Sequence, residues 1–530
     1  MGGGTRRALA AGLLGLLAFT SGEAEAQAPR KGGTVVFAMG GDPVTLNRNV
    51  SSNNADGLVA CAIYQGLTRI NGAGDVKPML ARAWTISPDG KTYEFLLNKA
   101  NWQDGQPFTS EDVKYTLLEI SAKYSAVFSG AGRVIDTIET PSPQKAVIRL
   151  KEPYGPLLLS LACPQGGAIL PKHLYEGTNP LQNPTTTQKP VGLGPFMLKE
   201  WKRGDYIRLV KNPTYWEPGK PYLDEIVAKV IPQPSARTQA LLTGEIDFIM
   251  GYFFAPNDFD AVKASPKLQL RPANIPPGID ILFLNVTRKP LDDRRVRQAL
   301  MMATDRDLLF KTAFLGVGGV GTMPFTNGIK WAADPNIDYR KMYPYDVAKA
   351  NALLDEAGVK RGADGIRFKM DILFSSDDPE PPLVIPAIKS MWRQIGVDVT
   401  VDGNERGAAT KRMFGDKACD CDASMIGYQS FGDPALGMAR AFVTSAIGKQ
   451  TGNGSSYSNT RVDELFEKAE HATAREDRGI YYKQVQGILA DELPMLTLHE
   501  RVLYDAMNKG LHGLEDEHSM ATWRDAWLEK

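Results

Sequence analysis

Residues Asn101 to Tyr115, NWQDGQPFTSEDVKY, combine three acidic side chains with the large aromatic side chains of Trp102 and Phe108. The three acids have two interpretations. They form a carboxylate cluster for acid–base chemistry, or they begin a turn and a helix. The first interpretation makes the chain a catalyst, and the second makes this stretch part of a scaffold.

The spacing of the residues favours the scaffold. Asp104 is followed by glycine, a pair typical of turns. Thr109 and Asp112 match the capping box that begins a helix, and acids in a first helical turn complement the helix dipole. We therefore predict a turn followed by a helix, with Trp102 and Phe108 packed against the surrounding domain.

The first 26 residues of this 530-residue chain are typical of a secretory signal peptide. Arg6 and Arg7 precede an apolar run at 8–19 that is too short to cross a bilayer, and small residues follow it. We expect cleavage near Ala26 and Gln27, and export to the periplasm by the general or the twin-arginine route.

The charges of the chain balance, because Lys and Arg number 61 and Asp and Glu number 61. A balanced surface has no long-range attraction to nucleic acid or anionic lipid. The sequence also has no nucleic-acid-binding motif, so we predict no nucleic-acid partner. A mature chain of about 500 residues predicts two or three lobes.

The pattern of apolar residues changes along the chain. The first half is typical of strands, for example at 33–39 and 92–98. After about Ile279, strands alternate with long helical patterns, which predicts an α/β lobe. Gly358 and Gly396 follow helical runs at the position of a left-handed cap. The last forty residues return to strand character, and we expect them to pair with the first lobe.

Three segments resemble catalytic or metal-binding motifs, but their spacing or the elements around them do not match what each motif requires. GVGGVG at 316–321 follows a helical pattern instead of a strand, so we predict a loop and no dinucleotide site. GYQSFG at 427–432 has one residue too many for a nucleophile elbow. HGLEDEH at 512–518 matches no defined metal spacing, so we predict an acidic loop, no metal and no other cofactor. The chain is predicted not to be an enzyme, and a secreted hydrolase stays open as an alternative.

The four cysteines can form disulfides in an exported protein. Cys419 and Cys421 are expected to bridge poorly, because strand geometry points them along one face without the dihedral angle of a disulfide. If a disulfide forms, we favour Cys61–Cys163.

Several blocks of the sequence resemble, in order, the family 5 extracytoplasmic solute-binding proteins. These proteins are the dipeptide-, oligopeptide- and nickel-binding components of ABC importers. The blocks are LARAWTISPDGKTYEFLLNKANWQDGQPFTSEDVKYTL at 80–117, PVGLGPFMLKEWKRGDYIRLVKNPTYWEPGKPYLDEI at 190–226, LNVTRKPLDDRRVRQALMMATDRD at 284–307, GYQSFGDP at 427–434 and YSNTRVDELFEKA at 457–469. The resemblance covers nearly the whole mature chain.

The resemblance implies a mixed α+β fold, a two-lobed periplasmic binding protein with a hinged cleft and an extra subdomain in the first lobe. The expected parts are the signal peptide at 1–26, the first lobe at 27–68, 185–280 and 500–530, its subdomain at 69–184, and the second lobe at 281–499. Crossings near Ile281 and His499 are expected to act as hinges. Closure of the lobes would bury the solute, and the membrane partner would recognise the closed form.

The resemblance also implies a ligand site. The segment GYQSFGDP matches the aromatic and polar segment with which family members contact their ligands. The implied contacts are Tyr428, Gln429, Ser430, Phe431 and Asp433, with Tyr64, Ser375 and Asp42 as weaker candidates. The alternative for the two aromatics is a place in the core.

One departure from the family pattern concerns the ligand. Peptide-binding members place an acid shortly after the aromatic residue to pair with the α-amine of the peptide, and this chain has Gln429, Ser430 and Phe431 there. The implied function is still the binding component of an ABC importer. It captures a peptide or peptide-like solute, acts as a monomer and delivers the solute to a permease and ATPase complex in the inner membrane. An opine, an oligosaccharide or a metal chelate is the alternative solute, and a chaperone-like role is an outside option.

Overall fold

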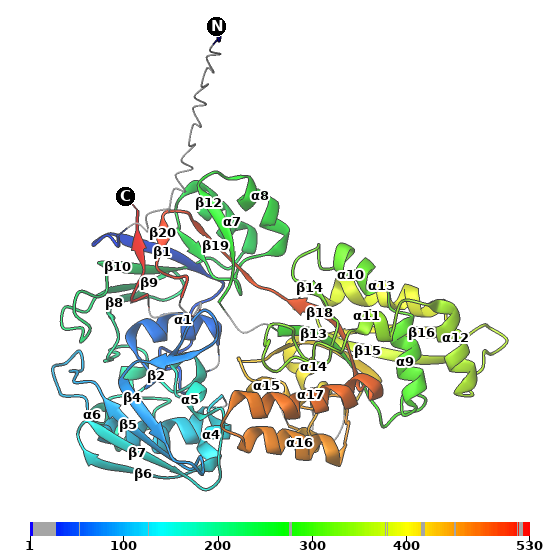
Figure 1. The fold of residues 1–530 in the computed structure, drawn as a ribbon, viewed down its shortest axis with the longest axis horizontal. Helices are drawn as coiled ribbons and strands as arrows, with labels where there is room; N and C mark the ends of the chain where they lie inside the picture. Colours follow the sequence, from blue (N-terminus) through cyan, green and yellow to red (C-terminus); the bar gives the residue numbers. More distant parts are fainter. Residues whose placement is uncertain are drawn as a thin grey trace.

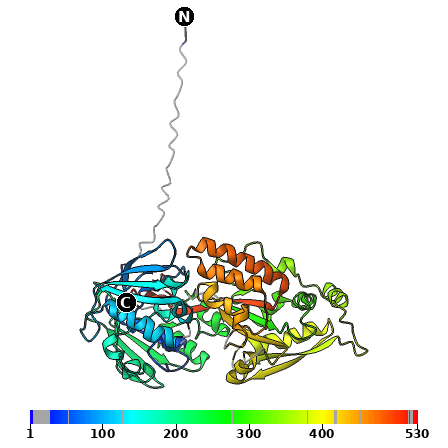
Figure 2. The same cartoon turned by 90° about the horizontal axis from the view of Figure 1, so that it is seen from below.

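The computed structural model describes residues 1–3, 28–51, 53–125, 127–274, 278–376, 378, 380–414, 419–449, 452–516, 518 and 523–529. The apolar run of the expected signal peptide lies outside the described residues. Among the described helices, none has the length and apolar character that a membrane crossing needs. The chain forms two lobes that lie side by side (Figures 1 and 2).

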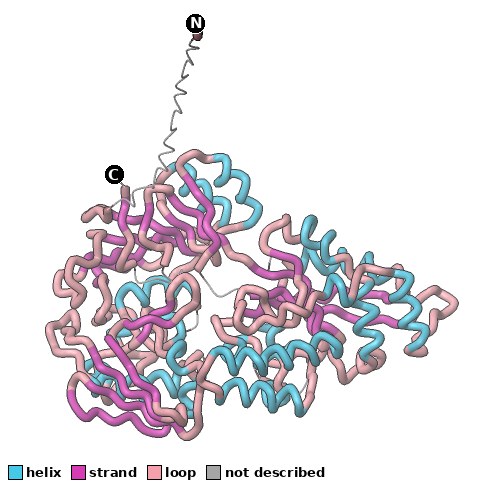
Figure 3. The backbone as a smooth tube through the Cα atoms, viewed as in Figure 1, coloured by secondary structure: helices cyan, strands magenta, loops and turns pink. Residues whose placement is uncertain are grey.

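A seven-stranded sheet forms the centre of one lobe (Figure 3), in the order β12-β19-β11-β1-β10-β9-β8. Its strands are β1 (Thr34–Met39), β8 (Phe196–Lys202), β9 (Tyr206–Lys211), β10 (Glu225–Val230), β11 (Phe248–Ile249), β12 (Leu268–Pro272) and β19 (Tyr504–Asn508). Val35, Phe37 and Met39 alternate along β1, and their side chains join the core that α1 (Asn54–Ile63) covers. β19 pairs with β11 and β12, which confirms the predicted return of the C-terminal segment.

Further short elements complete this lobe. They are β2 (Thr68–Ile70), β3 (Val76–Pro78), α7 (Pro234–Thr243), α8 (Phe259–Ala264), β20 (Leu511–His512) and β21 (Trp527–Leu528). The segment FMLKEWKRGDYIRLVKN forms β8 and β9, which pair antiparallel and are joined by a turn. Gly204 in this turn has a φ of 74°, a left-handed conformation that glycine adopts without a steric cost.

A four-stranded sheet in the order β4-β5-β7-β6 carries the stretch with which the sequence analysis began. Its elements are β4 (Ala81–Ile86), β5 (Thr92–Leu97), β6 (Ile135–Ser142) and β7 (Lys145–Leu150), with α2 (Ser110–Tyr115), α3 (Ala122–Tyr124), α4 (Ser129–Val134), α5 (Leu157–Ser160) and α6 (Lys172–Tyr175). The N–H of Thr109 donates to Asp112 Oδ2 at 2.9 Å at the start of α2. Trp102 and Phe108 are buried and meet edge to face at 6.0 Å. The predicted turn, capping box and packing are confirmed.

A six-stranded sheet forms the other lobe, in the order β14-β18-β13-β17-β15-β16. The strands are β13 (Gly278–Leu284), β14 (Gly319–Val320), β15 (Phe368–Ser375), β16 (Val397–Asn404), β17 (Ala423–Gln429) and β18 (Met495–Arg501). Every residue of β13 is buried, because hydrophobic clusters lie on both faces of this central strand. The segment GVGGVG is not a loop throughout, since β14 pairs with β18.

Helices alternate with these strands as the sequence predicted. They are α9 (Arg294–Met302), α10 (Arg306–Thr312), α11 (Tyr339–Met342), α12 (Val347–Glu356), α13 (Pro381–Arg393), α14 (Arg406–Met413), α15 (Pro434–Gly437), α16 (Thr460–His471) and α17 (Arg475–Glu492). Gly358 and Gly396 have φ angles of 79° and 78°, so both predicted left-handed caps are confirmed.

The chain passes twice between the large sheets. Residues 273–277, of which 275–277 lie outside the described residues, join β12 to β13, and Val502 and Leu503 join β18 to β19, the connection that Figure 1 draws as a ribbon. The strands on either side pair with each other, and the N–H of Ala273 donates to the carbonyl of Leu503 at 2.8 Å. Ile281 and His499, near which the crossings were expected, lie a few residues away inside β13 and β18.

The cysteines form two disulfides. Cys61 in α1 is bonded to Cys163, the pair that the sequence favoured. Cys419 is bonded to Cys421, so the expectation that these two bridge poorly is wrong. That expectation assumed strand geometry, whereas β17 begins only at Ala423 and the chain bends at the cysteines, which brings their Cα atoms to 5.2 Å.

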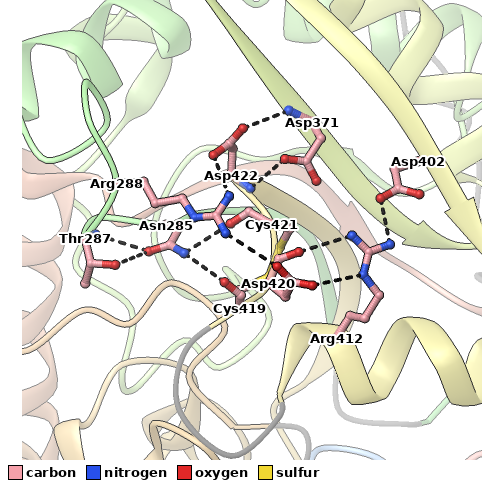
Figure 4. The surroundings of a disulfide bond; sticks show 10 residues. All are labelled: Asn285, Thr287, Arg288, Asp371, Asp402, Arg412, Cys419, Asp420, Cys421 and Asp422. Atoms are coloured by element: carbon pink, nitrogen blue, oxygen red, sulfur yellow. Dashed lines mark hydrogen bonds and ion pairs between the residues drawn. A yellow bond between two sulfur atoms is a disulfide. The ribbon is translucent and has the colours of Figure 1, made fainter.

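Asn285 holds the bend at Cys419 and Cys421 from the side of β13 (Figure 4). Its amide nitrogen donates to the carbonyl oxygens of both cysteines, each at 3.1 Å. Arg288 donates to Asp422 at 2.9 Å beside the same bend. The short disulfide therefore lies within a hydrogen-bonded loop that leads into β17.

The two disulfides should differ in their effect on stability. Cys61 and Cys163 are 102 residues apart, and Cys419 and Cys421 are two apart. Because a cross-link removes more entropy from the unfolded chain when its loop is longer, Cys61→Ser with Cys163→Ser should lower the free energy of unfolding by about 4–5 kcal/mol. Cys419→Ser with Cys421→Ser should lower it by about 1–2 kcal/mol. Urea denaturation of the oxidised proteins measures both, and equal losses would contradict the prediction.

Candidate functional site

A cavity of ≈ 1290 Å³ lies between the two lobes. One wall comes from the lobe with the seven-stranded sheet and includes Arg48, Gln165 and Tyr252, and the opposite wall includes Gln429 and Phe431. Small-molecule sites in proteins commonly enclose about 300–1,000 Å³. The cavity is therefore large enough for a solute of several residues or of comparable size.

The lobes also touch on the side of the cavity away from the crossings, and we call these contacts the latch. The latch consists of the N–H of Gly155 donating to the carbonyl of Glu470 at 2.8 Å, and ion pairs of Arg133 with Glu470 at 2.8 Å and of Arg475 with Asp75 at 3.0 Å. Figure 1 shows α4 beside α15 and α16 at this place. The cavity thus lies between the crossings and the latch.

The segment GYQSFGDP forms a turn at the end of β17 that projects Gln429 and Phe431 toward the cavity. Phe431 has a φ of 52°, which costs a non-glycine residue about 1–3 kcal/mol and is typical of functional sites. Gly437 in α15 packs against this turn so closely that a Cβ atom there would lie 2.1 Å from the carbonyl oxygen of Gln429. The position of α15 therefore maintains the strained turn.

Tyr428 lies behind the cavity wall instead of lining it. Its side chain is buried, it meets Phe283 edge to face at 5.6 Å, and its hydroxyl donates to the carbonyl of Gly452. Burial raises the pKa of the phenol well above its ordinary value. The core alternative holds for Tyr428 in this structure, and the side chain supports the turn that carries Phe431.

Asp433 and Ser430 are buried too. Asp433 caps α15 by accepting from the N–H of Ala435 at 3.0 Å, accepts from the hydroxyl of Tyr482 at 2.9 Å, and forms an ion pair with the buried Arg478. A carboxylate with these partners has a structural role in this conformation. Neither Asp433 nor Ser430 lines the cavity.

The three weaker candidates also lie off the cavity wall. Tyr64 is buried and donates to the carbonyl of Thr185 at 3.3 Å. Asp42 accepts from Trp201 Nε1 at 2.9 Å and pairs with Arg203 at 3.3 Å. Ser375 is the buried last residue of β15, and its hydroxyl has no hydrogen-bond partner among the described residues. Of the eight sequence candidates, the structure brings together only Gln429 and Phe431 at the cavity.

The cavity wall contains charged residues that the sequence analysis missed. The basic ones are Arg48, Arg133, Arg440 and Lys449, and the acidic ones are Asp463, Glu467 and Glu470. Asp463 and Glu467 lie within the family block at 457–469, but that match implied no ligand contact for them, and the spacing of the other residues gave no signal. The one sequence feature that could have pointed to a charged wall residue is Arg48, a single arginine in the polar segment NRNVSSNN.

Several of these charges already have partners. Glu470 pairs with Arg133, and burial raises the pKa of Glu470. The guanidinium of Arg440 lies 4.9 Å from the ring centre of Tyr428 and 5.8 Å from that of Phe431, distances at which cations are attracted to aromatic faces. The turn after β17 and Arg440 therefore form one packed unit at the second-lobe wall.

A buried charge cluster connects the crossings to the six-stranded sheet. Asp280 Oδ2 lies 2.8 Å from His499 Nδ1, and Asp280 Oδ1 lies 3.2 Å from Arg501 Nε. Arg501 also donates to Glu380 at 3.0 Å. Because Arg501 ends β18, this cluster anchors the chain where it leaves the sheet for the other lobe.

Comparison with known proteins gives a family model that matches much of the chain and relatives that cover most of it. The model of bacterial extracellular solute-binding proteins, family 5 Middle, matches residues 75–450. Di/tripeptide-binding protein 1 of Pseudomonas aeruginosa (strain UCBPP-PA14) is 28% identical over 506 residues, which cover 90% of this chain and 91% of that protein.

Two solved structures share the mixed α/β periplasmic binding protein fold. The ABC transporter-associated periplasmic binding protein DppA from Helicobacter pylori, in complex with the peptide STSA, is 27% identical with a TM-score of 0.77, over 94% of this chain and 99% of that chain. AgaA from A. tumefacien R10, in complex with agropinic acid, is 26% identical with a TM-score of 0.75, over 94% of this chain and 99% of that chain.

The structural role of Asp433 leads to a prediction. Asp433→Asn removes the charge that neutralises the buried Arg478, so the free energy of unfolding should fall by about 3–5 kcal/mol. The matched control is Asp398→Asn, which breaks an exposed ion pair with Arg393 and should cost at most about 1 kcal/mol. Urea denaturation compares them. Similar losses in the two variants would mean that Asp433 is not a structural residue.

Proposed function

The chain belongs to the family 5 bacterial extracellular solute-binding proteins, and from this premise we propose that its solute is a peptide or a peptide-like molecule. Proteins of this family bind solutes without catalysis, and the chain is the solute-binding component of an ABC importer. The proposal extends to export into the periplasm, action as a monomer and delivery of the solute to an inner-membrane permease and ATPase complex.

The cavity between the crossings and the latch is the observation that carries the proposal. A solute in this cavity contacts both lobes at once, at Arg48 and Tyr252 on one side and at Gln429 and Phe431 on the other. A ligand shifts a conformational equilibrium only as far as it binds one state better than the other. Contacts from both lobes exist only when the lobes are together, so the solute favours the closed form.

The domain ranges expected from the sequence belong to this proposal. We take 27–68, 185–280 and 500–530 as the first lobe, 69–184 as its subdomain and 281–499 as the second lobe. The connection at Val502 and Leu503 would then absorb part of the rotation of closure. The latch would form as the subdomain reaches the second lobe.

Charges of both signs on the cavity wall support a peptide-like solute. A peptide carries an ammonium group, a carboxylate and amides, and each needs a partner when water is excluded. The wall offers arginines for the carboxylate, Glu467 for the ammonium group and Gln429 for amides. Phe431 supplies an aromatic contact area with few rotamers to immobilise.

A non-peptide solute such as an opine is the second candidate. Asp433, the acid nearest in sequence to the cavity turn, is engaged by Arg478 and Tyr482. The relative AgaA is described in complex with agropinic acid. A solute without a free α-amine fits both observations, and an oligosaccharide or a metal chelate is a weaker form of the same alternative.

A ligand screen tests the proposal. The purified mature protein should show a rise in melting temperature with di- or tripeptides, or with opines, and small-angle scattering should show a smaller radius of gyration with the same ligand. Phe431→Ala should weaken that ligand about 10- to 100-fold, because it removes the aromatic contact.

The control for this screen is Tyr345→Ala, an exposed aromatic position of the second lobe, which should bind as the unmodified protein does. Sugars and metal chelates belong in the same screen. A shift with those solutes alone would exclude a peptide-like cargo, and recovery of a chemically changed ligand would show the hydrolase alternative.

A further inference from the structure

Arg48 is a buried cation on the first-lobe wall of the cavity. Only 5% of its surface is exposed. Its Nε donates to the carbonyl of Pro164 at 3.1 Å, and its Nη1 donates to the carbonyls of Ser51 and Asn53 at 3.2 and 3.0 Å. Burial lowers the pKa of Arg48 to about 10, so the side chain is still charged at neutral pH.

The bonds of Arg48 leave its charge uncompensated on the cavity side. Carbonyl oxygens orient the guanidinium but carry no net charge, and a buried cation without an ionic partner is costly. Among the described residues, no carboxylate forms an ion pair with Arg48. Asp56 is the acid that acts on it electrostatically, and Asp56 is fully buried, away from the cavity wall, where it accepts from the N–H of Val44 at 2.9 Å.

Two further hydrogen-bond donors lie on the same wall and within the electrostatic reach of Arg48. Burial raises the pKa of Tyr252 to about 12, so its phenol keeps the O–H that can donate. Burial and the charge of Arg48 lower the pKa of His518 to about 4, so its imidazole is neutral at pH 7 and carries one N–H. A cation, a phenol and a neutral imidazole together form a wall suited to an anion.

The remaining charges of the cavity do not offset this wall. Glu470 is paired with Arg133 in the latch. Asp463 accepts from the N–H of Thr444 at 2.9 Å. Glu467 is exposed and lies on the wall of the opposite lobe. The uncompensated charge that is buried at the cavity is therefore positive.

We infer that Arg48, with Tyr252 and His518, binds a carboxylate of the solute, and that the cargo is consequently an acidic peptide or an opine with more carboxylates than amines. The inference rests on the proposed function and narrows its solute class. A carboxylate brought against Arg48 on closure forms an ionic hydrogen bond in a dry site, where such bonds are strongest. A solute with no carboxylate to spare for Arg48 leaves the cation unpaired.

The competing explanation is that Arg48 only holds its loop together. Arg237 provides the comparison, because it is equally buried and donates to the carbonyls of Phe253, Ile231 and Pro232 at 2.7, 2.7 and 2.8 Å. Arg237 does not line the cavity. An arginine that only fixes a loop should affect all ligands equally, whereas an anion-binding arginine should affect acidic ligands selectively.

Matched ligand pairs separate these explanations. Calorimetry on the full mature protein compares Ala-Glu with Ala-Gln, and N-(1-carboxyethyl)glutamate with N-(1-carboxyethyl)glutamine. Each pair differs in one carboxylate against one amide of similar shape. We expect the acidic member of at least one pair to bind at least about 30-fold more tightly, the loss typical when a buried charge pair lacks one member. The pair that shows the preference identifies the peptide or the opine as the source of the carboxylate.

In Arg48→Gln the preference for the acidic member should fall below about threefold, while Arg237→Gln should keep it. Tyr252→Phe, which keeps the ring and removes the O–H, should reduce the preference several-fold and serves if Arg48→Gln does not fold. No acidic preference in the unmodified protein, or an equal loss for both members of a pair in Arg48→Gln, would overturn the inference while the proposed function stands. Binding of no peptide and no opine by the folded protein would overturn both.

Discussion

Two antiparallel strand pairs, one in each large sheet, flank the two passages of the chain between the lobes. β12 pairs with β19 in one sheet, and β13 pairs with β18 in the other, so both passages start and end on neighbouring strands. A doubled connection restricts the relative motion of the lobes more than a single linker would. The buried cluster of Asp280, His499 and Arg501 fixes the strand ends on the second-lobe side, so the closure we propose would bend the chain outside these strands.

The position of the cavity follows from this constraint. In the closure we propose, lobes joined by two passages of the chain at one side would close on a solute at the opposite side, and the latch lies there. The space enclosed between the two contacts is lined from both lobes. The residues of this region have two separate roles. Tyr428 and Asp433 hold the turn after β17 from behind, while Phe431 and Arg48 lie on the wall.

For the family segment GYQSFGDP, the sequence match located a turn, and the structure showed which of its side chains face the cavity. The match identified a turn that reaches the cavity, since Gln429 and Phe431 line it. It did not separate the residues of the turn that face the cavity from those that face the core. The hydroxyl of Tyr428 donates to the carbonyl of Gly452. Asp433 forms an ion pair with Arg478, which lies 45 residues further along the chain. Two features decide whether a side chain of this segment faces the cavity or the core. They are the alternation of side chains along β17 and the left-handed backbone of Phe431, and residue types alone predict neither.

The sequence by itself determined the elements, the family and the absence of a recognisable catalytic motif. The capping box at Thr109, the caps at Gly358 and Gly396 and the return of the C-terminal strand depend on local patterns, which neighbouring residues specify. The tertiary structure alone decided the bend that joins Cys419 to Cys421, the places of the crossings and the residues of the cavity wall. Arg48 donates to the carbonyl of Pro164, 116 residues away in the chain, and no local pattern of the sequence relates these two segments.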